Sequence, residues 1–128
     1  MKIEPPRELR PVERSVIETL LDIPFAGRDE LRAQLPFVRI IDESFCCPSI
    51  KLAVDPERAA PAPISGKGPI VEAKCTDENG GFSEILLFVA DGYLEDLETV
   101  HYVSDKLLRF PIIELVTLFQ SPTPQSLT

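Results

Sequence analysis

The chain has 128 residues and a formal net charge of −8, and its length is typical of one domain. This acidity disfavours binding to nucleic acid or to an anionic membrane, and no run approaches the ~18 apolar residues that a membrane-spanning helix needs. The first residues lack the apolar stretch of a secretory signal, and the cysteine count of 3 is odd, so we expect a reduced, cytoplasmic protein.

The first part of the chain carries the pattern of two short helices after a tail. We expect residues 1–8 to be flexible. Pro11 suits the first turn of a helix, and apolar residues then recur at helical spacing, which predicts a helix over residues 11–22. A second short helix is expected between Gly27 and Pro36, with acidic residues in its first turn. Together they form an amphipathic helical hairpin that must lie on another element.

The period then changes to that of short strands. Residues 37–41 and 49–54 are rich in β-branched side chains, and the segment between them carries the adjacent pair Cys46 and Cys47. Residues 55–69 are rich in proline and contain no aromatic side chain. We expect that segment to be a surface loop and the most mobile internal part of the chain.

A second group of strands follows this loop. Residues 70–76 alternate apolar and polar side chains, residues 82–90 are apolar on both faces, and Asn79-Gly80-Gly81 between them suits a hairpin turn. The Asp91-Gly92 turn leads into a strand over residues 93–103, with a bulge expected near Glu95 and Asp96.

The last segments complete a single domain over residues 1–128. Residues 112–119 are apolar with a period that fits helix and strand about equally well, and residues 121–128 are expected to be a flexible tail. Successive hairpins with helices on one face predict an α+β fold. Its expected architecture is an N-terminal helical hairpin packed on an antiparallel β-meander of about five strands.

Three segments resemble a known family: RELRPVE at residues 7–13, FAGRDEL at residues 25–31 and VADGYL at residues 89–94. The chain resembles, over roughly residues 7–111, a family of small bacterial proteins known only as a domain of unknown function. The resemblance implies a bacterial cytosolic origin. It brings no activity and no site residues with it.

The residues that usually carry chemistry are sparse. His101 is the only histidine, it lies beside Tyr102, and no nucleophile motif is close to it in sequence. The three cysteines lack the spacing of a zinc site, and each is expected to pack as a small hydrophobic side chain. We therefore expect no catalytic residues, no cofactor and no metal.

The acidic residues are unevenly distributed. Residues 1–63 carry a net charge of −2 and residues 64–128 a net charge of −6. Many of these carboxylates alternate with core residues, which predicts a sheet with one buried face and one acidic, solvated face. An acidic face attracts basic proteins. The candidate protein-binding residues are Asp77, Glu78, Glu84, Glu95, Asp96 and Glu98.

The sequence therefore favours a non-catalytic bacterial protein-binding module, of the immunity-protein or antitoxin kind, that binds a basic partner through this acidic face. One alternative is an uncharacterised accessory or self-associating domain, forming a homo-oligomer through residues 112–119. Another is a small-molecule-binding domain with a pocket between the helices and the sheet, near His101, Tyr102 and Arg28.

Overall fold

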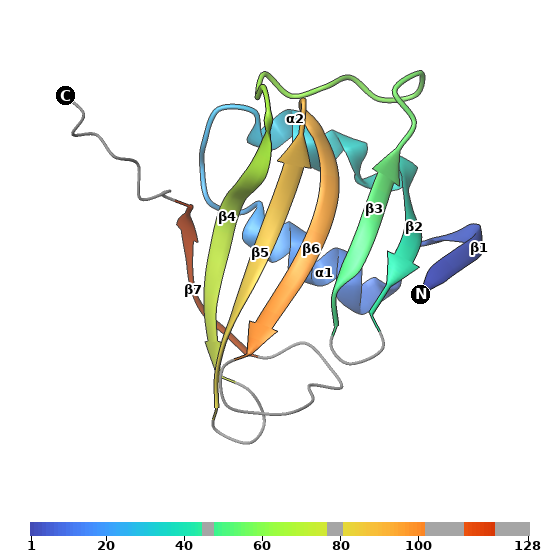
Figure 1. Cartoon of the computed structure of the whole chain (residues 1–128). Coiled ribbons are helices and arrows are strands. Elements are labelled where there is room, and N and C mark those ends of the chain that lie inside the picture. The colour runs from blue at the N-terminus through green and yellow to red at the C-terminus, as the bar shows by residue number, and fades with distance from the viewer. Residues whose placement is uncertain (45–47, 77–80, 102–111, 120–128) are drawn as a thin grey trace.

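Figure 1 shows a computed structural model of the chain, with two helices on one face of a seven-stranded antiparallel sheet. The structure describes residues 1–44, 48–76, 81–101 and 112–119. The expected α+β class is confirmed. The elements in chain order are β1 (Lys2–Glu8), α1 (Pro11–Leu20), α2 (Arg28–Gln34), the 3₁₀ helix η1 (Leu35–Phe37), β2 (Val38–Glu43), β3 (Ile50–Val54), β4 (Lys67–Thr76), β5 (Phe82–Ala90), β6 (Tyr93–His101) and β7 (Ile112–Leu118).

The sheet is larger than the expected five-stranded meander and is connected differently. Its strand order is β1-β2-β3-β6-β5-β4-β7, so two meanders meet where β3 pairs with β6. The two unforeseen strands are at the edges. Residues 1–8, expected as a flexible tail, contribute β1, which pairs with β2. The ambiguous segment 112–119 contributes β7, which pairs with β4. Pairing with a neighbour far away in sequence decided both assignments.

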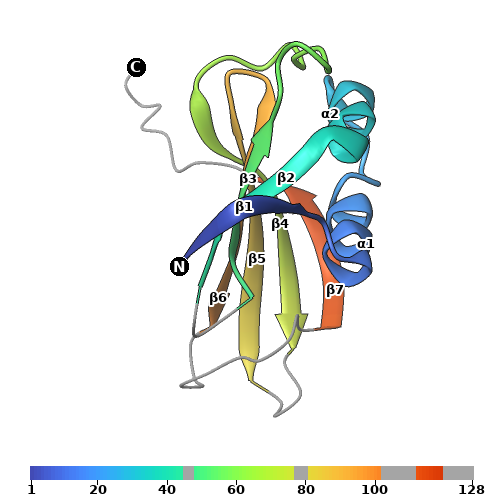
Figure 2. The same cartoon turned by 90° about the vertical axis from the view of Figure 1, so that its right-hand side faces the viewer.

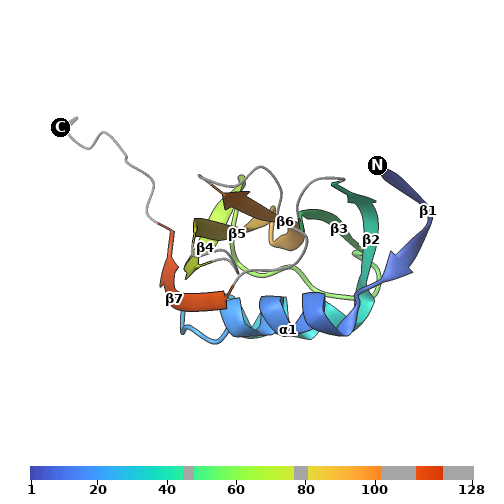
Figure 3. The ribbon, with the colours of Figure 1, turned by 90° about the horizontal axis from the view of Figure 1, so that it is seen from below.

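Both helices were predicted, and their apolar sides form the core. Ile17 and Leu20 of α1, Leu21 directly after it and Leu31 of α2 are completely buried in one cluster with the sheet residues. Figure 2 shows the two helices stacked on one side of the sheet. Seen from below in Figure 3, the sheet curves around α1. The helices therefore cover the concave face, and the outward side chains of the strands lie on the convex face.

The segment between β3 and β4 is tied to the β5–β6 turn rather than free. Strand β4 begins at Lys67, so this crossover loop comprises residues 55–66 and is shorter than the predicted loop 55–69. The Ala62 N–H donates to the Gly92 carbonyl at 2.9 Å, and the Asp91 N–H donates to the Gly66 carbonyl at 2.8 Å. Ala62 is itself buried. These hydrogen bonds fix the loop across one end of the sheet, along the top of Figure 1.

The β5–β6 hairpin agrees with the sequence prediction in detail. Asp91 and Gly92 have φ values of +47° and +86°, as a two-residue turn of type I′ requires. The register then shifts, because Phe88 pairs with Asp96 while Val89 pairs with Leu94. Glu95 is the extra residue, so the predicted bulge at Glu95 and Asp96 is confirmed.

Some expectations concern parts of the chain outside the described residues. These are the positions of Cys46 and Cys47, the turn at Asn79 and Gly80, and the tail 121–128. Neither helix of the described part has the length or the apolar composition needed to cross a bilayer.

Candidate functional site

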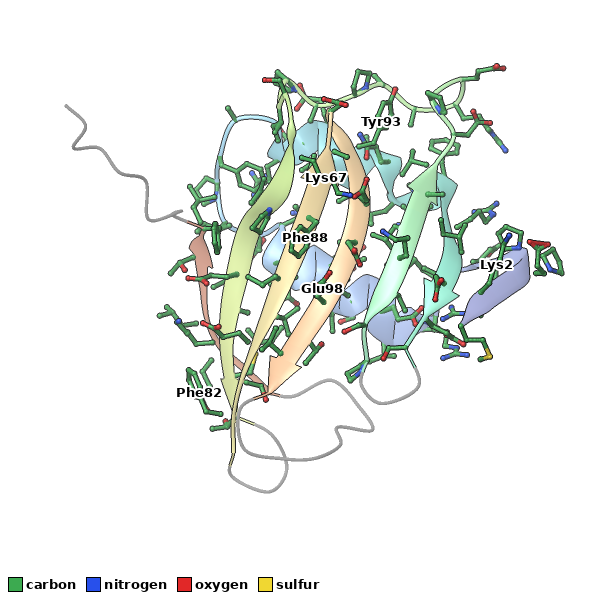
Figure 4. All side chains as sticks on the ribbon, viewed as in Figure 1. Lys2, Lys67, Phe82, Phe88, Tyr93 and Glu98 are labelled. Carbon is green, nitrogen blue, oxygen red and sulfur yellow. The ribbon has the colours of Figure 1, made fainter. Side chains whose placement is uncertain are left out.

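The convex face of the sheet is the candidate site. Along β5, Ile85, Leu87 and Val89 are buried toward the helices, and the alternate residues point the other way. Figure 4 shows Lys67, Phe88 and Glu98 on this outward side. Within the described residues, no helix covers it (Figure 3). We call this surface the open face, and its central residues are Lys51, Lys67, Glu72, Lys74, Glu84, Leu86, Phe88, Glu95, Asp96 and Glu98.

The structure brings four of the predicted carboxylates onto this one surface. Glu98 of β6 pairs with Leu86 of β5, and Glu84 pairs with the residue two positions beyond Glu98. Asp96 and the bulge residue Glu95 complete the group on the same strand. The remaining candidates, residues 77 and 78, lie outside the described part of the chain. The four described candidates therefore share one face, and Glu95 does so beside Asp96 because it is the bulge residue.

Two lysines of β4, which sequence reasoning overlooked, lie beside two of these carboxylates. Lys74 Nζ lies 2.5 Å from Glu84 Oε2, and Lys67 Nζ lies 2.7 Å from Glu95 Oε2. The first pair had a sequence signal, since Lys74 and Glu84 are equally distant from Asn79 in the predicted hairpin turn. The second pair had none, because the residues belong to different hairpins. This part of the open face therefore carries both positive and negative charges and is not uniformly acidic.

The β6 side of the open face is more acidic. Asp96 and Glu98 lie side by side along the strand, and Lys51 Nζ is 3.5 Å from Asp96 Oδ2. Burial, the neighbouring Asp96 charge and a hydrogen bond with Asp96 together raise the pKa of Glu98 above its ordinary value. Lys51 is thus the lysine that lies near both carboxylates. They also line a hollow of about 230 Å³, whose charged side chains are Asp42, Glu43, Lys51, Asp96 and Glu98.

The far wall of this hollow is anchored by an ion-pair network. Arg7 Nη2 donates to Glu43 Oε1 at 2.8 Å and to Glu13 Oε2 at 2.9 Å, while Arg7 Nη1 donates to Glu13 Oε1 at 3.0 Å. The Glu43 carboxylate is therefore already engaged by a guanidinium. Asp96 and Glu98 are the better candidates to receive a cation from outside, because repulsion between them remains.

Of the residues named for a small-molecule pocket, only Arg28 has a described side chain. Arg28 Nη1 donates to the Asp22 carbonyl at 3.0 Å and so holds the segment between the two helices. His101 ends β6, and both its side chain and Tyr102 lie outside the described part. The described residues contain no cluster of three His, Cys, Asp or Glu side chains placed to hold a metal ion.

Cys75 packs in the core, as expected for a small hydrophobic side chain. It is buried on β4, and burial raises the pKa of its thiol to about 11. The thiol is therefore protonated at neutral pH, which makes it a poor nucleophile.

Comparison of the chain with family models, with curated proteins and with solved structures finds no match. The resemblance to small bacterial proteins of unknown function remains a hypothesis.

Proposed function

We propose that the chain is a non-catalytic protein-binding module whose open face receives a basic partner, in the manner of an immunity protein or antitoxin. The observation that carries the proposal is the Asp96–Glu98 pair, two adjacent carboxylates beside a hollow with Lys51 as their nearby lysine. This proposal narrows the six candidates of the sequence analysis to two central residues.

The electrostatics of this pair favour a cation. Burial of Glu98 and its repulsion by the Asp96 charge oppose ionisation of Glu98, as its raised pKa reflects. An arginine or lysine from a partner, placed over Asp96 and Glu98, relieves that repulsion and lowers the Glu98 pKa. Binding is thus linked to proton release, so affinity for a basic partner rises with pH through the Glu98 titration.

The other residues of the open face suit the part of an interface that surrounds the Asp96–Glu98 contact. Leu86 and Phe88 lie half-buried between the charged rows and offer apolar contact area. The Lys67–Glu95 ion pair presents both charges, so a partner must place its own charges in a matching order. This charge pattern contributes specificity more than affinity.

A pair of isosteric amide substitutions tests the proposal. The double variant Asp96→Asn/Glu98→Gln and the wild type are used as bait in lysate from cells that express the chain, with Glu57→Gln in the exposed crossover loop as the control. We expect wild type and control to retain a basic protein at low salt, and the double variant to lose at least about tenfold in affinity. A hexa-arginine peptide serves as a defined probe of the same face, followed by NMR shifts of Leu86 and Phe88. Equal binding by the double variant in both assays refutes the proposal.

A further inference from the structure

The two edges of the sheet have opposite character. Strand β1 reads KIEPPRE, and its two prolines lack the N–H that another strand would need as a hydrogen-bond donor. Charges at Lys2, Glu4, Arg7 and Glu8 further discourage pairing at this edge. Strand β7 reads IIELVTL, with no proline and with Glu114 as its one charge. Its Leu115 and Leu118 side chains are 55% and 40% exposed.

We infer that β7 pairs antiparallel with β7 of a second copy of this chain, joining the two sheets edge to edge about a two-fold axis. Within the described residues, β7 pairs with β4 alone, so the backbone N–H and C=O groups of its other edge have no strand partner there. The register with β4 shifts at Glu114 and is regular from Leu115 to Leu118. Apart from the bulge at Glu114, the strand has no proline that would remove a backbone donor, so it is a template for another strand. This inference does not rest on the function proposed above.

The second copy is the fitting occupant because the strand is complementary to itself. Two identical antiparallel strands are related by a two-fold axis, so each contact is made twice. With the axis at Leu115, this leucine faces its own copy, and the bulge residue Glu114 lies near Val116 of the partner subunit. No like charges meet in that register, and two exposed leucines are buried against each other.

The same edges explain why pairing stops at two copies. Head-to-tail pairing of β7 with β1 would repeat without end, but the consecutive Pro5 and Pro6 leave the outer edge of β1 without a backbone donor at this point. Pairing of β7 with β7 occupies the free β7 edge of both copies, which gives a closed dimer.

The dimer is expected to be weak and to respond to salt in a definite direction. One strand pair buries less area than the roughly 1,200–2,000 Å² of a stable interface. Each copy also carries a net charge of −8, so the copies repel at low salt. Screening by salt therefore strengthens dimerisation, whereas it weakens binding of a basic partner to the open face. The two proposals respond oppositely to the same variable.

Sedimentation velocity of the full chain tests the inference across roughly 5–500 μM protein, a range that brackets weak association. We expect the mass to rise from 14.3 kDa toward twice that value, more readily at high salt. Leu115→Lys places two like charges opposite each other and should leave a monomer. Val12→Lys is the matched control, since Val12 of α1 has the same 55% exposure, and it should dimerise as the wild type does.

Mixing provides the register test. Leu115→Lys and Leu115→Glu chains should each be monomeric alone and form a heterodimer together, because opposite charges then meet across the axis. Circular dichroism confirms that the variants are folded. A wild type that stays monomeric throughout, a Leu115→Lys chain that dimerises normally, or a mixture that stays monomeric overturns the inference. The Asp96→Asn/Glu98→Gln variant should dimerise like the wild type, which separates this interface from the open face.

Discussion

The side-chain amide of Gln34 donates a hydrogen bond of 2.8 Å to the backbone carbonyl of Gly92, 58 residues further along the chain. The same Nε2 donates to the Ala60 carbonyl at 3.0 Å, and Oε1 accepts from the Leu94 N–H at 3.0 Å. Gln34 is completely buried at the end of α2. One amide therefore joins a helix, the crossover loop and the β5–β6 hairpin.

Replacing Gln34 with methionine should destabilise the fold by about 2–3 kcal/mol, because a side chain of similar length leaves the Leu94 N–H and the Ala60 carbonyl without this partner. Ala33→Met, at the exposed neighbouring position, should change the free energy of unfolding by less than about 0.5 kcal/mol. Urea denaturation followed by circular dichroism measures both. Equal midpoints for the two variants would contradict the bridging role of the amide.

Gly92→Ala should cost clearly more stability than Gly66→Ala. Both glycines have positive φ, +86° and +81°, so both substitutions strain the backbone by about 1 kcal/mol. A Cβ at residue 92 would lie 2.3 Å from the Ala62 carbonyl oxygen, whereas a Cβ at residue 66 meets no atom within 4 Å. The difference between the melting temperatures of the two variants measures the destabilisation caused by the clash with the crossover loop. A Gly66→Ala variant that is less stable than Gly92→Ala would argue against this packing.

Removing the guanidinium of Arg7 should destabilise the protein in a pH-dependent way. Burial acts to raise the pKa of Glu13, but hydrogen bonds from the Arg7 side chain and the Arg10 N–H outweigh it and hold that pKa below its ordinary value. The ionised Glu13 therefore stabilises the folded state at pH values above the Glu13 pKa of the unfolded chain. This stabilisation is lost as the pH falls through the Glu13 pKa of the folded chain. Arg7→Met should cost about 3 kcal/mol at pH 7 and much less in acid.

The matched control for Arg7 is Arg14→Met, which removes the exposed Arg14–Glu18 pair on α1. Such a pair contributes about 0.3–0.5 kcal/mol at most. Urea midpoints for both variants between neutral and acidic pH provide the measurement. A difference between Arg7→Met and wild type that stays constant over this range would show that the Glu13 carboxylate is not its source.

Glu98→Gln should stabilise the chain slightly at neutral pH and weaken partner binding. The folded pKa of Glu98 lies above its ordinary value because of burial and the nearby Asp96, so the folded state binds the proton more tightly than the unfolded state. Stability then declines as the pH rises through the Glu98 titration, and removing the charge recovers a few tenths of a kcal/mol. Thermal melts at neutral and acidic pH should show the gain only at neutral pH. A neutral-pH loss would mean that the carboxylate is structurally satisfied.

The sequence alone determined the elements whose signals are local. The start of α1 at Pro11, the turn at Asp91 and Gly92 and the bulge at Glu95 each depend on residues within a few positions of one another, although α1 ends at Leu20 and not at the predicted residue 22. The same holds for the shared face of Glu84 and Glu98, since alternation along paired strands is a property of backbone geometry.

Tertiary structure decided what depends on residues distant in the chain. Strands β1 and β7 exist because β2 and β4 offer them hydrogen-bonding edges, and their own patterns were neutral or misleading. The lysine beside Asp96 comes from β3, and the partners of Gln34 come from a loop and a hairpin. Such contacts follow from the order in which the strands pair. Free-energy differences over the whole fold select that order, and no short stretch of sequence encodes it.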